Sequence, residues 1–373
     1  MQEYNTEHPF DLTLSEEQQM TWDMLRKFAE TELRPSARQT EIDGKPSDKL
    51  LEKIKSLDLI PLIIPEAYGG MGLEQDSVSN ALALEALAYG DLSLAMSVSV
   101  PLLVTQIISE HGSEEQKGEL LPKLVNGSIF HVGLGINNVL LSTDPYQSSV
   151  TVEENGEEII LNGSKTGVAF ANHAKTFLIS ASNESGECNL YFVNKDQEGV
   201  ALEDKEFMGL KGAPLSQINL SNCKINASQK LGGHNYSINY ESLIDSSRIG
   251  MSALALGVCQ AVLDYVVPYT NERVAFDEPI SNRQSVAFMI ADMAIETEAL
   301  RLMIYKSAAL KDLGEDFHKQ ASLTYRFAAH HGMKIGTDGV QLLGGHGFTH
   351  EHPVELWYRN LRAIGIFEGG AGV

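Results

Sequence analysis

Glu368 is the residue best suited to chemistry, because it stands near the end of the chain between Phe367 and Gly369. Apolar neighbours raise the pKa of a buried carboxyl group by desolvation. A carboxylate that titrates near neutrality in a dry pocket can remove a proton from a carbon next to a carbonyl group. A capping or surface glutamate is the plainer interpretation, and these residues alone leave both interpretations open.

A second set of residues is suited to holding phosphate. Gly344 and Gly345 follow a predicted helix that contains Gln341, and glycines at such a position let backbone N–H groups approach an anion. Arg273 and Phe276 follow another long predicted helix, and an arginine can clamp a phosphate through two parallel hydrogen bonds. Close helix packing at the glycines and a surface arginine beside a core aromatic ring are the competing interpretations.

Other common sites are not indicated. His346, His350 and His352 lie close together, but we find no carboxylate or cysteine spaced to complete a metal-ligand set. We therefore predict a solvated turn and no metal site. The G-x-G at 133–135 lacks the third glycine and the βαβ context of a dinucleotide fingerprint. The sequence also contains no Walker loop, H-E-x-x-H or G-x-S-x-G motif.

Helical periodicity dominates the first third of the chain. Ser15 and Gln18 form a capping-box pattern, apolar residues then recur at helical spacing, and Pro35 is expected to end that helix. Three further helices are predicted over 76–89, 92–111 and 114–125. We assign residues 1–128 to an N-terminal helical domain.

The middle of the chain alternates apolar and polar residues, which is typical of strands. The pairs Asn155-Gly156 and Asn162-Gly163 stand after such alternating runs and predict hairpin turns. We therefore predict an antiparallel β domain over residues 129–236. Helical patterns return in residues 237–373, where helices are predicted over 240–271, 281–313, 319–343 and 354–361.

Charge and composition exclude several classes of protein. The 373 residues include 28 Lys and Arg against 50 Asp and Glu, which gives a formal net charge of −22. A nucleic-acid binder or a polybasic membrane anchor needs a basic face. Three distant cysteines make a disulfide framework improbable, and the acidic N-terminus does not have the pattern of a signal peptide. We expect a cytoplasmic protein that does not insert into a membrane.

Six stretches of the chain, in order, resemble the acyl-CoA dehydrogenases over nearly its whole length. They are 65–72 (PEAYGGMG), 112–127 (GSEEQKGELLPKLVNG), 161–165 (LNGSK), 208–212 (MGLKG), 269–284 (YTNERVAFDEPISNRQ) and 341–369 (QLLGGHGFTHEHPVELWYRNLRAIGIFEG). The resemblance implies an α-helical N-domain, a β middle domain and a C-terminal four-helix bundle. It also implies FAD in a homo-oligomer, a dimer or usually a tetramer, with electrons leaving to an electron-transfer flavoprotein.

The implied reaction is α,β-dehydrogenation of an acyl-CoA thioester in fatty acid metabolism. The family's usual base maps onto Glu368, which would take the α proton while the β hydride passes to flavin N5. Some members carry the base at the position of Ser247, whose side chain cannot serve. The positions that match acyl-CoA contacts are Ser142, Asp245, Arg248 and Gly369. The positions that match FAD contacts, several of them to the cofactor of a neighbouring subunit, are Arg273, Phe276, Gln284, Gln341, Gly344 and Gly345.

The sequence departs from the family pattern around the flavin ring. The family's T-E-P-x-A-G-S-D segment reads I-N-N-V-L-L-S-T at 136–143, and its W-I-T reads G-V-A at 167–169. A family glycine is replaced by Asp277, whose charge would repel a pyrophosphate unless it is turned away. A family threonine is replaced by Gly370. Each lost hydrogen bond costs on the order of 1 kcal/mol of binding free energy.

Three interpretations follow from this pattern. The first is an active FAD-dependent acyl-CoA dehydrogenase with Glu368 as base. The second is a degenerate family member with weak or absent FAD binding that binds acyl-CoA or supports an active partner. The third is a flavin enzyme of the same fold that acts on another carbon acid or reacts with oxygen, because a glycine at 167 would open one flavin face. Acyl chain length and branching are not encoded in these motifs.

Overall fold

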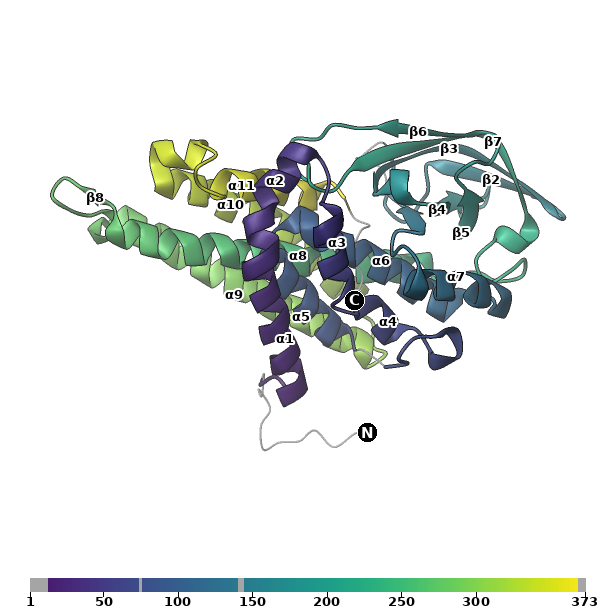
Figure 1. Cartoon of the computed structure of the whole chain (residues 1–373), viewed down its shortest axis with the longest axis horizontal. Helices are drawn as coiled ribbons and strands as arrows, with labels where there is room; N and C mark the ends of the chain where they lie inside the picture. Colours follow the sequence, from purple (N-terminus) through teal and green to yellow (C-terminus); the bar gives the residue numbers. More distant parts are fainter. Residues whose placement is uncertain (1–12, 74–75, 140–143, 368–373) are drawn as a thin grey trace.

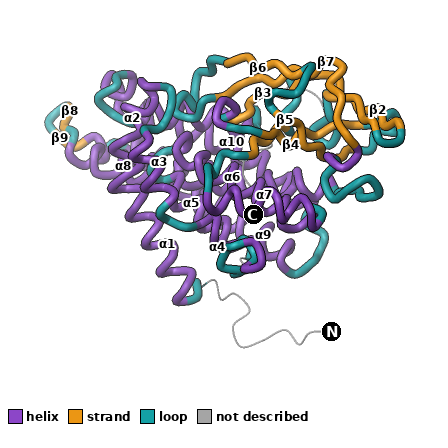
Figure 2. Tube along the Cα trace, turned by 45° about the vertical axis from the view of Figure 1, so that its right-hand side comes forward, coloured by secondary structure: helices purple, strands orange, loops and turns teal. Residues whose placement is uncertain are grey.

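The computed structural model describes residues 13–73, 76–139 and 144–367. Figure 1 shows a β-sheet at one end of a larger helical body, whose longest helices run away from the sheet towards a small hairpin. In the second view the strands of this sheet again gather at one end, and the small hairpin lies at the other (Figure 2). The element types change between Asn126 and Val132, and again between Gln229 and Tyr240.

The four predicted N-terminal helices are present, with one correction at Pro35, and three further helices between residues 34 and 63 were not predicted. Together they are α1 (Glu16–Phe28), α2 (Arg34–Asp43), α3 (Asp48–Lys55), α4 (Leu59–Ile63), α5 (Ser77–Ala88), α6 (Leu92–His111) and α7 (Glu114–Asn126). The capping box of α1 is confirmed, since the backbone N–H of Gln18 donates to Ser15 Oγ at 3.1 Å. Pro35 does not end the helix. A π-helical segment, Ala29–Leu33, joins α1 to α2, and Pro35 lies in the first turn of α2, where a helix tolerates a missing N–H.

The middle domain is a seven-stranded sheet with the order β1-β4-β2-β3-β7-β6, and β5 pairs with β4. The strands are β1 (Val132–Gly135), β2 (Val150–Asn155), β3 (Glu158–Ala169), β4 (Thr176–Ser182), β5 (Cys188–Asn194), β6 (Val200–Asp204) and β7 (Leu215–Asn226). The turn at Asn155-Gly156 is confirmed by the pairing of Asn155 with Glu158. Asn162-Gly163 is not a turn, since it lies inside β3 at a bulge. The sheet is mixed rather than fully antiparallel, because β4 runs parallel to β1 and β2.

Up to Phe367, where its described part ends, the C-terminal domain has three long α-helices and one short one. The helices are α8 (Tyr240–Glu272), α9 (Gln284–Asp312), α10 (His318–Leu343) and α11 (Val354–Leu361), and a hairpin of β8 (Val274–Ala275) and β9 (Glu278–Pro279) joins α8 to α9. α8 packs against α9 and α10, and the short α11 packs against α10. The predicted boundaries of α11 are confirmed, and those of α8 and α10 differ by one residue at one end.

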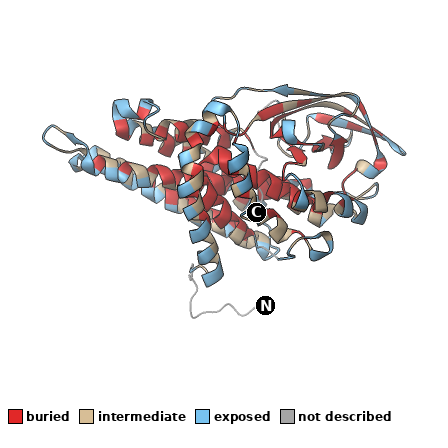
Figure 3. Cartoon of the chain, in the orientation of Figure 1, coloured by how far each residue is buried: buried red, intermediate tan, exposed pale blue. Residues whose placement is uncertain are grey.

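The core lies where α5, α6 and α8 meet, and these helices are the most continuously buried in Figure 3. By length and composition α6 and α8 are apolar enough to cross a membrane, but 89 % and 78 % of their most apolar windows is buried inside the protein. Gly257 allows the closest approach of α8 to α5, since a Cβ there would lie 2.2 Å from the carbonyl oxygen of Glu85. Their apolar character is therefore that of central core helices.

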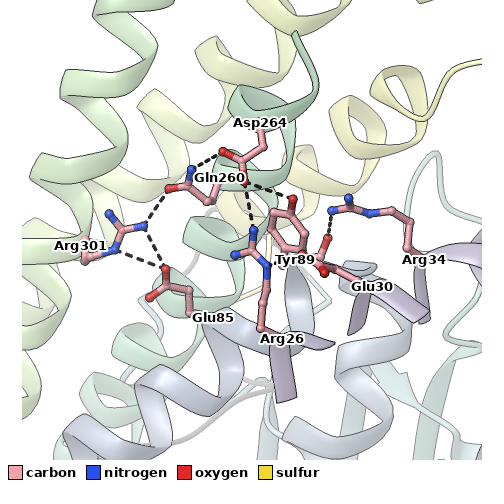
Figure 4. A network of polar contacts seen from close by, with 8 residues as sticks. All are labelled: Arg26, Glu30, Arg34, Glu85, Tyr89, Gln260, Asp264 and Arg301. Atoms are coloured by element: carbon pink, nitrogen blue, oxygen red, sulfur yellow. Dashed lines mark hydrogen bonds and ion pairs between the residues drawn. The ribbon is translucent and has the colours of Figure 1, made fainter. Parts of the chain in front are cut away.

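A network of charged side chains ties four of these helices together (Figure 4). Arg301 of α9 donates to the buried Glu85 of α5 at 3.0 Å and to Gln260 of α8 at 2.9 Å. Gln260 in turn donates to Asp264, which also accepts a hydrogen bond from Arg26 of α1 at 3.0 Å. The network orients α1 and α5 against α8, the helix that carries functional candidates at both of its ends.

Candidate functional site

Five of the six residues predicted to bind a cofactor line one pocket. This pocket has a volume of about 570 Å³ and lies where the ends of α8 and α10 meet the β8–β9 hairpin. The predicted residues that line it are Arg273, Phe276, Gln341, Gly344 and Gly345. The sixth, Gln284, is the first residue of α9 and stands between the lining residues Arg283 and Ser285.

The lining of this pocket suits an anionic group. It carries the guanidinium groups of Arg273 and Arg283 and the amide of Gln341, and no carboxylate is among its lining side chains. Arg283 also forms an ion pair of 3.2 Å with Glu278. A Cβ on Gly345 would meet nothing within 4 Å, so the backbone there borders open space. Such a concentration of positive charge in a chain of net charge −22 favours a phosphate-bearing ligand.

Asp277, which replaces a family glycine, lies in the turn of the β8–β9 hairpin. Phe276 and Asp277 form its two-residue turn, with φ values of 56° and 66°. Positive φ at both central residues is typical of a type I′ turn, in which glycine is favoured at the second position. Asp277 does not line the pocket, so its carboxylate does not oppose a phosphate from within the lining.

A second group of candidate residues lies near the other end of α8. Glu368, Gly369 and Ser142 fall outside the described residues, and so does Gly370. Phe367, the residue before Glu368, is buried, and the Tyr325 hydroxyl lies 3.5 Å from its carbonyl oxygen and donates to the carbonyl oxygen of Ile364 at 2.5 Å. The guanidinium carbon of Arg248 lies 5.7 Å from the centre of the Tyr325 ring. The chain leading to Glu368 is therefore packed beside the predicted acyl-CoA contacts.

The ring of Phe367 occupies the space beside Gly167. A Cβ on Gly167 would lie 2.5 Å from Phe367 Cε1, and the φ of Gly167 is 62° at an irregularity of β3. Phe207 packs edge-on against the same ring at 5.6 Å. An aromatic ring therefore fills the space that a side chain at 167 would take, and the expectation that a glycine at 167 opens one flavin face stays a prediction.

Asp245 and Arg248 lie one helical turn apart on α8 and are both buried. The Tyr146 hydroxyl donates to Asp245 Oδ1 at 2.9 Å, and His318 Nδ1 lies 2.7 Å from Asp245 Oδ2. Arg248 donates to the hydroxyl oxygens of Tyr146 and Ser322. Burial and the hydrogen bond to Asp245 raise the pKa of Tyr146 to about 12, so the phenol stays protonated at neutral pH. The alternative base position, Ser247, is fully buried within α8.

Lys165 contacts two of the residues at which the segment 136–143 differs from the family pattern. Its side chain is fully buried, and its Nζ donates to the carbonyl oxygen of Ile136 at 3.2 Å and to Asn138 Oδ1 at 2.8 Å. The same Oδ1 accepts a hydrogen bond from the backbone of Ser149. Burial lowers the pKa of Lys165 to about 7. The asparagine that replaces a family residue at 138 therefore anchors residues 136–138 to β3.

Comparison with known proteins decides the family. Residues 15–128, 141–223 and 239–373 match the N-terminal, middle and C-terminal domains of acyl-CoA dehydrogenases. The chain is 32% identical over 370 residues to the probable acyl-CoA dehydrogenase FadE25 of Mycobacterium tuberculosis, with 96% of this chain and 94% of that one covered. The chain belongs to the acyl-CoA dehydrogenase family.

Two solved structures of the family superpose over almost the whole chain. A glutaryl-coenzyme A dehydrogenase in complex with glutaryl-CoA is 28% identical with a TM-score of 0.86, over 97% of this chain and 93% of that one. A glutaryl-CoA dehydrogenase of Mycobacterium smegmatis in complex with FADH2 is 25% identical with a TM-score of 0.84, over 95% and 92%. The predicted fold class of this family member is thereby confirmed.

Several residues of these two sites were not predicted. Tyr146 and His318 cap Asp245, Arg283 joins the cofactor pocket, and Lys165 anchors the segment beside β3. The one sequence signal near Lys165 was its place in the stretch 161–165 (LNGSK), which resembles the family. The contacts of Tyr146 and His318 span 99 and 73 residues of sequence, which no local pattern reveals.

Proposed function

We propose that this family member catalyses FAD-dependent α,β-dehydrogenation of an acyl-CoA thioester, with Glu368 as the base that removes the α proton. The observation that supports the proposal most strongly is the packing of Phe367 against Tyr325, beside Asp245 and Arg248. This packing holds the residue before Glu368 close to the residues that match the family's acyl-CoA contacts.

The described residues contribute positioning rather than proton transfer. Arg248 offers a cation for the CoA thioester's polar groups, and Asp245 holds that cation through an ion pair of 3.3 Å. Phe367, Gly167 and Phe207 exclude water beside the segment that leads to Glu368. Exclusion of water raises the pKa of a carboxylate and brings it towards the value that proton abstraction requires.

FAD is the cofactor that fits the pocket at the far end of α8. Arg273, Gln341 and the backbone at Gly344 and Gly345 would hold its phosphates and neighbouring groups. When bound, FAD supplies the acceptor for the β hydride at N5 of its flavin. We propose that the electrons leave to an electron-transfer flavoprotein.

The distance between the two sites favours a homo-oligomer. Asp245 lies in the second turn of α8 and Arg273 is the residue that caps its C-terminal end, 28 residues further on, which corresponds to about 42 Å at ~1.5 Å per residue. One dinucleotide bound in the pocket at Arg273 cannot extend as far as the predicted acyl-CoA contact Asp245 of the same chain. The pocket of one copy would therefore serve the cofactor whose flavin lies in a second copy.

Spectroscopy of the purified protein tests the proposal. We expect a yellow protein whose flavin absorbance bleaches when an acyl-CoA is added without oxygen. Glu368→Gln should keep acyl-CoA binding and lose flavin reduction by at least ~100-fold, as expected for removal of a general base. Undiminished reduction in Glu368→Gln would exclude this residue as the base.

The same measurement separates the two other interpretations. A colourless protein that gains no absorbance with added FAD but binds acyl-CoA would support the degenerate, non-catalytic family member. Bleaching followed by rapid reoxidation in air would favour a flavin enzyme that reacts with oxygen. Chain-length preference follows from a comparison of short, long and branched acyl-CoA thioesters in the bleaching assay.

A further inference from the structure

Three side chains that can bind a metal ion lie close together in the turn between α10 and α11, beside the pocket described above. One ligand atom each from His346, Glu351 and His352 lies within 4.8 Å of the other two. The sequence analysis found no carboxylate spaced to complete a metal-ligand set, whereas the fold of the turn brings Glu351 close to the two histidines. Two imidazoles and one carboxylate are a set that Zn²⁺ binds in proteins.

The backbone of the turn brings these residues together. His346 belongs to the 3-10 segment Gly344–Phe348, and its carbonyl oxygen accepts hydrogen bonds from both the backbone N–H and the hydroxyl of Thr349. This folds the chain back so that residues 351 and 352 return to His346. The rings of His346 and His352 lie 5.6 Å apart, nearly perpendicular to each other.

A partner on α8 orients one of the imidazoles. His352 Nδ1 lies 2.7 Å from the hydroxyl of Tyr265. When Nδ1–H donates to that oxygen, the lone pair of Nε2 is free for a metal, which is the common arrangement around metal-binding histidines. Tyr265 is itself held edge-on by Trp357 at 5.7 Å, so the His352 ring has a fixed support.

The geometry allows the ligands to close on an ion. A tetrahedral Zn²⁺ with bonds of ~2.0–2.1 Å places its ligand atoms about 3.3 Å apart. His346 and Glu351 are exposed, so rotation of their side chains can supply the remaining movement. Three protein ligands leave a fourth position for water or an anion. His346 also lines the pocket that holds Arg273 and Gly345, so the ion would add positive charge at its rim.

We propose that His346, Glu351 and His352 bind one divalent transition-metal ion, with Zn²⁺ as the representative ion. The bound ion would link the turn that follows α10 to the residues just before α11. This metal site is separate from the proposed base Glu368, and metal binding to it can be measured without turnover.

Equilibrium dialysis of the full chain without an affinity tag tests the site. We expect one Zn²⁺ per chain for the wild type. His346→Asn, Glu351→Gln and His352→Asn should each weaken binding at least ~10-fold, whereas the matched control His350→Asn, in the same turn, should bind as the wild type does. Circular dichroism of each variant without metal checks that it is folded.

A second measurement uses Co²⁺ as a spectroscopic probe. Visible absorption from Co²⁺ should appear in the wild type and in His350→Asn and should be lost in His346→Asn. Zn²⁺ should also raise the melting temperature of the wild type but not that of His346→Asn. Absence of a stoichiometric site in the wild type, or equal binding by His346→Asn, would overturn the proposal.

Discussion

At the scale of single residues, Gly167 stands where the family pattern has a tryptophan, and a ring from a distant part of the chain packs beside it. Its backbone is left-handed, and the ring of Phe367 fills the space where a side chain would stand. The loss of a tryptophan therefore leaves no hole, because a neighbouring aromatic ring provides the packing.

Gly167→Ala should destabilise the protein more than an alanine at another left-handed glycine. Gly156 has nearly the same φ, 66° against 62°, but a Cβ there meets nothing within 4 Å. Backbone strain costs about 1–2 kcal/mol in both variants, and the clash with Phe367 adds roughly 1–3 kcal/mol at Gly167 alone. Urea unfolding measures the difference, and Gly167→Ala combined with Phe367→Leu should recover part of it. Equal losses in the two single variants would contradict the packing argument.

Lys165 should make the stability of the protein depend on pH above neutrality. Its pKa is about 7 when folded and 10.5 when unfolded, so the unfolded chain binds more protons between these values. The free energy of unfolding should therefore rise with pH from about 7 to 10.5 by roughly 2–4 kcal/mol, relative to Lys165→Met. Below pH 7 both states are protonated and the difference should be constant.

Urea unfolding of the wild type and Lys165→Met at several pH values measures this effect. Lys175, an exposed lysine on the same domain, provides the control, since Lys175→Met should follow the wild type across the range. A difference between wild type and Lys165→Met that does not change with pH would show that Lys165 stays charged in the folded protein.

At the scale of elements, α8 is central because it touches the helices of both helical domains. Its contacts with α5 are close at Gly257, and its polar residues join the network of Figure 4. The carboxylate of Glu85 lies in this core and is satisfied by Arg301 and by the hydroxyl of Tyr305 at 2.9 Å. The arrangement of α5 against α9 therefore depends on a buried ion pair.

Arg301→Met should cost about 3–5 kcal/mol of unfolding free energy, because it leaves the Glu85 charge buried without its cation. Arg301→Met combined with Glu85→Gln should recover most of that loss. Lys224→Met is a suitable control, since it removes an exposed ion pair with Glu158 that is worth about 0–1 kcal/mol. Thermal or urea unfolding checks all three variants. A cost for Arg301→Met as small as that for Lys224→Met would argue against a buried pair.

At the scale of the whole molecule, one face of α9 remains apolar and exposed. Phe288, Ile295 and Leu302 recur every seven residues and are 60 %, 67 % and 43 % exposed. A helical stripe of this kind is typical of an interface. The separation of the two sites along α8 also calls for a second copy. A homo-oligomer would cover the stripe and bring the two half-sites together.

Ile295→Asp should lower the native mass and release FAD, if cofactor binding needs two copies. Light scattering after size-exclusion chromatography measures the mass, and flavin absorbance measures the cofactor. Met20→Asp changes a side chain on α1 that is 72 % exposed, and it should alter neither quantity. A wild-type monomer that retains FAD would rule out the shared site.

The sequence by itself determined the family, the order of its domains and many local features. The capping box at Ser15 and the turn at Asn155-Gly156 were predictable because they depend on residues three or four positions apart. The same local rules were wrong at Pro35 and at Asn162-Gly163. Pro35 lies in the first turn of α2, where a helix tolerates a missing N–H, and at Asn162-Gly163 the pairing of β3 with β2 and β7 outweighed the local preference.

Only the tertiary structure decided how distant residues meet. Three contacts join segments that are far apart in the chain and form only when these segments are buried together. They are Phe367 with Gly167, His318 with Asp245, and Tyr265 with His352. Six cofactor candidates were predicted from motifs, but the pocket that five of them share arises because α8 and α10 end at the same place. The chemistry that a motif can perform depends on its residue types and their short spacing in the sequence. The geometry of a site depends on which faces of the helices and strands pack together to exclude water.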